Sequence, residues 1–153
     1  MEITMEIEHT ITYWNNGNKK AEWWKLNGKY HRVDGPAVIY YYESNEILSE
    51  YWHINGGRHR IDAPALTHYY KSGNIEREVW CFNGEIHNIE GPAYICYCDD
   101  VAFEYKHWYL NGKKLTNDEE IKYKEWLIDN NLADKNYNTW TDDKKVLWRL
   151  TWV

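Results

Sequence analysis

Cysteine, proline and long apolar runs are scarce in this 153-residue chain, and positive charge is in deficit. Three cysteines, an odd number without a secretory signal pattern near the N-terminus, argue against a disulfide framework and favour reduced thiols. The formal net charge of −6 is spread along the chain, which argues against nucleic acid and anionic membranes as partners. No apolar run approaches the ~20 residues that span a bilayer. We therefore expect a soluble, cytoplasmic protein.

Aromatic residues are abundant instead. Ten Trp, 14 Tyr and 2 Phe make up 17% of the chain, while its mean hydropathy is negative. Aromatic rings must therefore supply much of the packing.

The sequence repeats itself with a step of 28 residues, which four independent sets of markers share. These are Trp24, Trp52, Trp80 and Trp108; the turn pairs Asn27-Gly28, Asn55-Gly56, Asn83-Gly84 and Asn111-Gly112; Tyr13, Tyr41, Tyr69 and Tyr97; and Pro36, Pro64 and Pro92, each followed by alanine.

Each repeat predicts one β-hairpin and one connector. Residues 37–43 and 47–54 are rich in Tyr, Ile and Val and flank a Ser-Asn-Glu turn, and the second strand is expected to end at the Asn-Gly pair. A connector follows, with the pattern His-Arg-x-Asp-Gly-Pro-Ala, and its proline starts the next strand. At the N-terminus, alternation of apolar and polar residues from Ile3 to Tyr13 predicts an edge strand. The predicted fold is all-β, an array of antiparallel hairpins.

The period stops after Gly112. Thr116 to Glu119 fits a capping box, and the spacing of apolar residues predicts helices over 118–132 and 141–152. We therefore divide the chain into a repeat array, residues 1–115, and a small helical C-terminal cap, residues 116–153. Whether the helices cover the end of the array or one of its faces is left open.

The repeated Trp-x-x-Asn-Gly-x-x-His-Arg-x-Asp-Gly-Pro-Ala string, closed by Trp108 to Lys113 and a helix, resembles the MORN-like repeat proteins of bacteriophages and large DNA viruses. The resemblance covers roughly residues 13–132. It implies a hairpin meander that serves as an interaction scaffold, and an accessory factor that acts on host proteins or host defence, in the host cytoplasm. This chain departs from the pattern at four positions, which carry Ala63, Asn88, Glu90 and Leu115.

The His-Arg-x-Asp clusters have a structural and a functional interpretation. Equivalent histidines two strands apart would lie roughly 10 Å from one another, too far to share one metal ion. A catalytic centre needs groups in different roles, whereas three near-copies favour hydrogen bonds and ion pairs between neighbouring repeats. We therefore expect no catalytic residues, metal or cofactor. The alternative is a hydrolase that uses a pair such as His59 and Asp62.

The tryptophan row and the cysteines also have a structural and a functional interpretation each. The tryptophans are expected to pack the sheet, although an exposed row would also stack ligand rings or anchor a partner. Cys96 and Cys98 share a strand face near Cys81, but no fourth metal ligand is evident. Some tyrosines must face water, because neighbours along a strand alternate between faces.

The sequence thus favours a non-catalytic binding protein that engages a host protein. The alternatives are capture of a small, anionic, nucleotide-like ligand and, as the weakest, peripheral membrane binding; a homo-oligomer is left open. The residues expected to contact a partner or ligand are Arg32, Arg58, Arg60, His31, His59, Trp24, Trp52 and Trp80.

Overall fold

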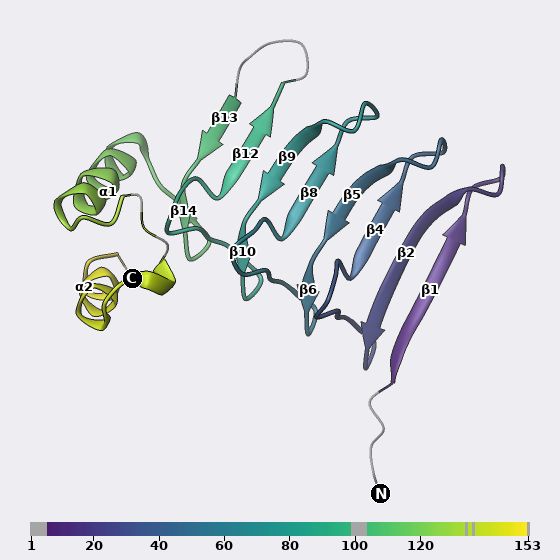
Figure 1. Cartoon of the computed structure of the whole chain (residues 1–153), viewed down its shortest axis with the longest axis horizontal. Helices are drawn as coiled ribbons and strands as arrows, with labels where there is room; N and C mark the ends of the chain where they lie inside the picture. The colour runs from purple at the N-terminus through teal and green to yellow at the C-terminus, as the bar shows by residue number, and fades with distance from the viewer. Residues whose placement is uncertain (1–5, 99–103, 134, 136, 153) are drawn as a thin grey trace, which may run out of the picture.

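The strands follow one another across a single-layer antiparallel sheet that is closed at one end by two helices (Figure 1). The computed structural model describes residues 6–98, 104–133, 135 and 137–152. The all-β array with a helical cap is therefore confirmed. Of the predicted N-terminal strand, residues 7–13 form β1, and Ile3 and Met5 lie outside the described residues.

The main sheet has the order β1-β2-β4-β5-β8-β9-β12-β13, so that each strand pairs with the next long strand in sequence. Its strands are β1 (Ile7–Tyr13), β2 (Lys19–Leu26), β4 (Val38–Tyr41), β5 (Ile47–Tyr51), β8 (Leu66–Tyr69), β9 (Ile75–Val79), β12 (Tyr94–Tyr97) and β13 (Glu104–His107). The register places Glu50 between Ile39 and Thr67 on one face of the sheet, which fixes which side chains share that face.

The Asn-Gly pairs form the turns of small secondary hairpins, a feature that the sequence analysis missed. The two-residue strands that flank them are β6 (His53–Ile54) with β7 (Gly57–Arg58), β10 (Cys81–Phe82) with β11 (Glu85–Ile86), β14 (Tyr109–Leu110) with β15 (Lys113–Lys114), and β3 (Lys29–Tyr30) against β2. Both turn residues take positive φ, 52° at Asn55 and 89° at Gly56, which asparagine and glycine tolerate best.

Backbone hydrogen bonds join each small hairpin to its neighbour. Gly56 N–H donates to the carbonyl of Tyr30 at 2.8 Å, and Gly84 N–H donates to that of Arg58 at 2.9 Å. These bonds run along the edge of the array where the connectors lie. The array is therefore held together by the small hairpins as well as by the main sheet.

The main sheet buries only small groups of apolar side chains. The alanines after the three prolines, Ala37, Ala65 and Ala93, are fully buried, and a small apolar cluster surrounds the second of them. The larger core lies at the C-terminal end, where the helices meet the last hairpin; its members are Ile89, Trp108, Leu110, Leu115, Tyr123, Leu127, Leu132, Trp140 and Trp148.

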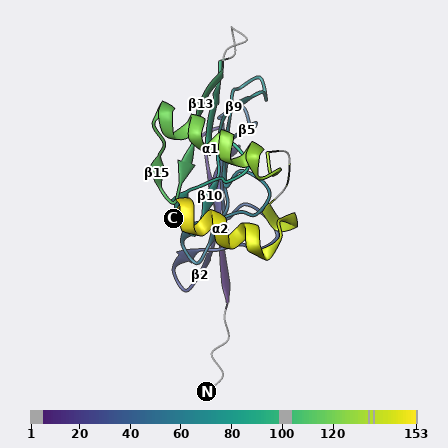
Figure 2. The same cartoon turned by 90° about the vertical axis from the view of Figure 1, so that its left-hand side faces the viewer.

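The helices α1 (Asn117–Asp129) and α2 (Asp142–Trp152), with the short 3-10 helix η1 (Tyr137–Thr139) between them, lie across the end of the sheet (Figure 2). The capping box of Thr116 and Glu119 is confirmed. Helix α1 ends earlier than the predicted residue 132, because Asn131 takes a left-handed conformation with φ of 56°. Among the described residues, no helix is long and apolar enough to cross a membrane.

Candidate functional site

Each connector histidine is held by the next repeat. The Nδ1 atoms of His31, His59 and His87 accept hydrogen bonds from the backbone N–H groups 24 residues later, at 3.1, 3.1 and 2.9 Å. A ring nitrogen that accepts carries no proton, so the proton of the neutral His59 and His87 rings lies on Nε2. At His31, Nδ1 also lies 2.9 Å from the side-chain oxygen of Asn55. In this arrangement the histidines fasten one repeat to the next.

The connector arginines cover the tryptophans of their own repeats. The guanidinium carbon of Arg32 lies 4.0 Å from the ring centroid of Trp24, and that of Arg60 lies 3.9 Å from that of Trp52. Each guanidinium also donates to the carbonyl of the connector proline, at 3.4 Å to Pro36 in the first repeat. A cation–π contact and a hydrogen bond thus fix both arginines in place.

A second row of contacts, made by tyrosine and glutamate, was missed from the sequence. Tyr69 donates to Glu50 at 2.8 Å, and equivalent pairs join Tyr41 to Glu22 and Tyr97 to Glu78. Burial, together with the Glu50 carboxylate, raises the pKa of Tyr69 to about 12. The signal was present in the sequence, because these glutamates and tyrosines both recur every 28 residues.

The third repeat lacks the arginine that covers the tryptophan in each of the first two repeats. Asn88 stands where the other connectors have arginine, and its amide donates to the carbonyl of Pro92 at 3.2 Å. In the first repeat, a Cβ added to Gly35 would lie 2.7 Å from the Arg32 guanidinium, whereas at Gly91 the nearest atom, of Asn88, would be 3.7 Å away. The shorter side chain therefore leaves space above the connector that an arginine fills elsewhere.

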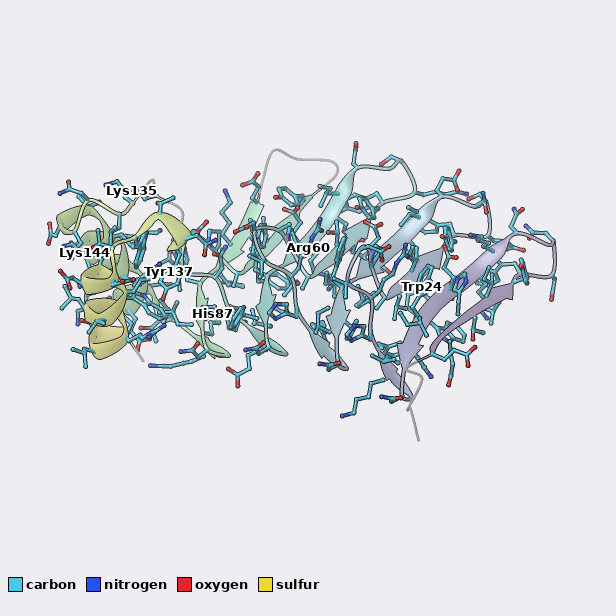
Figure 3. The ribbon with its side chains drawn as sticks, turned by 60° about the horizontal axis from the view of Figure 1, so that its bottom comes forward. Trp24, Arg60, His87, Lys135, Tyr137 and Lys144 are labelled. Carbon is cyan, nitrogen blue, oxygen red and sulfur yellow. The ribbon has the colours of Figure 1, made fainter. Side chains whose placement is uncertain are left out.

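A groove of about 820 Å³ occupies this region, between the second and third connectors and the helical cap. Figure 3 labels three of the residues that line it, Arg60, His87 and Tyr137. The residues that line it are Arg60, Ile61, Asp62, Trp80, Cys81, Phe82, His87, Asn88, Ile89, Glu90, Gly91, Pro92, Ile95, Asn111, Tyr137, Asn138, Trp148 and Arg149.

The cap closes the groove through specific contacts. The backbone N–H of Tyr137 donates to the carboxylate of Glu90 at 2.6 Å, and Asn138 donates to Asp62 at 3.4 Å. The rings of His87 and Trp148 meet edge to face, 6.1 Å apart. Burial lowers the pKa of His87, and Glu85 opposes this only in part, so that His87 is neutral near neutral pH.

Equivalent connector positions differ sharply in exposure. Ile89 is buried beneath the cap, whereas Ile61 at the rim of the groove is 61% exposed and Val33 in the first connector is 77% exposed. Phe82, another lining residue, is 47% exposed. The lining of the groove therefore includes exposed apolar side chains, Ile61 and Phe82.

Of the residues predicted to contact a ligand, Arg60 and Trp80 line the groove. The structure places the other six, His31, His59, Trp24, Trp52, Arg32 and Arg58, along the array outside it. His87, Tyr137, Trp148 and Arg149 were missed, since their meeting depends on how the cap folds back. All three cysteines are free thiols, and the described residues include no group of three or more His, Cys, Asp and Glu placed to hold a metal.

No known family model, curated protein or solved structure matches this chain.

Proposed function

We propose that this protein is a non-catalytic binding module that engages a partner protein through the groove between the second and third connectors and the cap. One observation carries the proposal: where Asn88 replaces arginine, a groove of about 820 Å³ opens among aromatic side chains. Its volume lies in the range of small-molecule binding pockets, so it has room for a side chain of a partner. The repeats supply a rigid frame for it.

The apolar rim favours a protein over a small molecule. Ile61 and Phe82 line the groove yet stay largely exposed, and exposed apolar groups around a concave site are typical of protein interfaces. The resemblance to viral repeat proteins suggests a host protein as the partner. An accessory role in host defence would follow from that resemblance alone.

The hydrogen bonds of the histidines support a binding role over hydrolysis. A general base at Nδ1 of His59 would have to release the backbone N–H of Asn83. If Nε2 were the base, Nδ1 would carry the proton and could no longer accept that bond.

The test is capture from host lysate with the full-length protein and two matched variants. Ile61→Asp places a charge at the rim of the groove, and Val33→Asp makes an equivalent change at the same connector position outside it. We expect a saturable protein partner that is lost with Ile61→Asp and retained with Val33→Asp, both variants being folded by circular dichroism. A partner that binds all three proteins equally would overturn the proposal.

A second candidate, capture of a small anionic ligand, is favoured by the guanidinium groups of Arg60 and Arg149 at the groove. It predicts a nucleotide-like molecule that co-purifies with the protein and is lost when Arg149 is replaced by glutamate. Retention of that molecule by the variant would exclude this candidate.

A further inference from the structure

Three of the four repeat tryptophans have a cation from this chain above the ring. Arg32 covers Trp24 and Arg60 covers Trp52; over Trp108 the cation is Lys124, at 5.2 Å from the centroid. The remaining one is Trp80, and in the described part of the chain no cationic group lies over it. Trp80 lines the groove together with Asn88, which holds the position of the missing arginine.

From this pattern we infer that the groove receives an arginine side chain of the partner, whose guanidinium stacks on Trp80 as Arg32 and Arg60 stack on their own tryptophans. This inference rests on the proposed function and names the chemistry of the occupant. Guanidinium groups are planar and weakly hydrated, so they stack on indole faces at little cost of desolvation.

The charges that line the groove are compatible with an incoming cation. Asp62 and Glu90 supply two carboxylates, against the guanidinium groups of Arg60 and Arg149. These four groups balance in charge, and three of them already have contacts: Arg60 stacks on Trp52 and donates to the carbonyl of Pro64 at 3.3 Å, Glu90 accepts from Tyr137 N–H, and Asp62 accepts from Asn138. The lining therefore presents no net positive charge to an incoming guanidinium.

The occupant must also fit beside Asn88. In the first repeat, the guanidinium above Gly35 packs so closely that a methyl group there would lie 2.7 Å from it. Above Gly91 the nearest atom to a Cβ would be 3.7 Å away, which leaves more room than in the first repeat. An arginine of the partner would thus enter the space that Arg32 fills in the first repeat and that Asn88 leaves open in the third.

The test is a titration of the ¹⁵N-labelled full-length protein with three acetylated and amidated tripeptides, in which glycines flank arginine, citrulline or lysine. Citrulline has nearly the shape of arginine without its charge. The Trp80→Phe variant identifies the indole N–H signal of Trp80 among the ten tryptophans. We expect the arginine peptide to shift this signal and to bind on the order of tenfold more tightly than the citrulline peptide.

The same titration is repeated with the Asn88→Arg variant, which gives the decisive comparison. Its own side chain should occupy the space above Trp80 and abolish binding of the arginine peptide, while Asn88→Gln, which keeps the amide, should still bind. The nine other indole signals report whether each variant is folded. Binding retained by Asn88→Arg, or equal shifts with citrulline, would overturn the inference.

Two further outcomes separate this inference from the proposed function. A captured protein that is lost with Ile61→Asp but still binds Asn88→Arg would leave the proposed function standing and overturn the arginine as its anchor. Free L-arginine that binds as tightly as the peptide would overturn a protein side chain as the occupant and point to a small guanidino compound.

Discussion

The Nδ1 atom of His59 lies 3.1 Å from the backbone nitrogen of Asn83 and accepts a hydrogen bond from it. The same pairing over 24 residues joins His87 to Asn111. Both bonds require a neutral imidazole ring, because a protonated ring has no acceptor. At His87, where burial lowers the pKa, this requirement couples the contact between repeats to pH.

For His87 the direction of this coupling follows from its pKa, which burial holds below the ordinary value. Below pH ~6.5 the unfolded chain takes up a proton that folded His87 resists, so stability is fully present above that pH and is lost as the pH falls. We expect His87→Asn, which keeps an acceptor near Nδ1 and does not titrate, to lose less stability than the wild type. Urea unfolding from pH ~8 to ~5 measures this. Identical pH slopes for the two proteins would contradict the role of His87.

Replacing Arg60 by leucine should destabilise the fold by about 1–2 kcal/mol, because the contact with Trp52 and the bond to Pro64 are both lost. The matched control is Arg58→Leu on the exposed strand β7, for which the change should stay within ~0.5 kcal/mol. Denaturant midpoints compare the two. Equal losses would show that the stacked arginine contributes nothing specific.

The tyrosine–glutamate pairs predict a loss of stability in alkali. The pKa of Tyr69 is about 12 in the folded protein, above the ordinary value of ~10. Its contribution is therefore fully present below pH ~10 and disappears as the pH rises through about 12. From pH ~9 to ~12, the wild type should lose more stability than Tyr69→Phe, which has no proton to release. Parallel curves would refute a contribution from this pair.

The cap should depend on the hydroxyl group of Tyr123, which donates to the carbonyl of Ile89 at 2.8 Å and accepts from the indole of Trp148 at 3.1 Å. Tyr123→Phe leaves both partners unsatisfied in a buried site and should cost about 1–3 kcal/mol. Tyr13→Phe, at a residue that is 59% exposed, is the control and should be nearly neutral. Thermal unfolding of both variants provides the measurement. A neutral Tyr123→Phe would show that the cap does not depend on these bonds.

Local patterns in the sequence predicted the sheet and the cap well. The step of 28 residues located the hairpins, and the capping box at Thr116 gave the start of α1. The small hairpins escaped because strands of two residues are too short to show a period, although the Asn-Gly pairs that form their turns were identified.

The groove was beyond what the sequence could predict. Asn88 was recognised as a departure from the repeat, but its consequence depends on Tyr137 and Trp148, which reach it from the cap about 50 to 60 positions later in the chain. A periodic pattern carries no information on how an aperiodic segment docks. Whether other groups of the chain cover the ring of Trp80 depends on tertiary packing.

The role of Asn88 in opening a recognition site is best measured with the Asn88→Arg variant, assayed for both stability and partner capture. If the third repeat gave up a structural arginine to make a recognition site, restoring it should raise the denaturant midpoint, because Trp80 regains a stacked cation, and should abolish capture of the partner. A variant that is less stable and still captures the partner would contradict this role of Asn88, since the space above Trp80 would then be neither a repeat position left open nor the site of recognition.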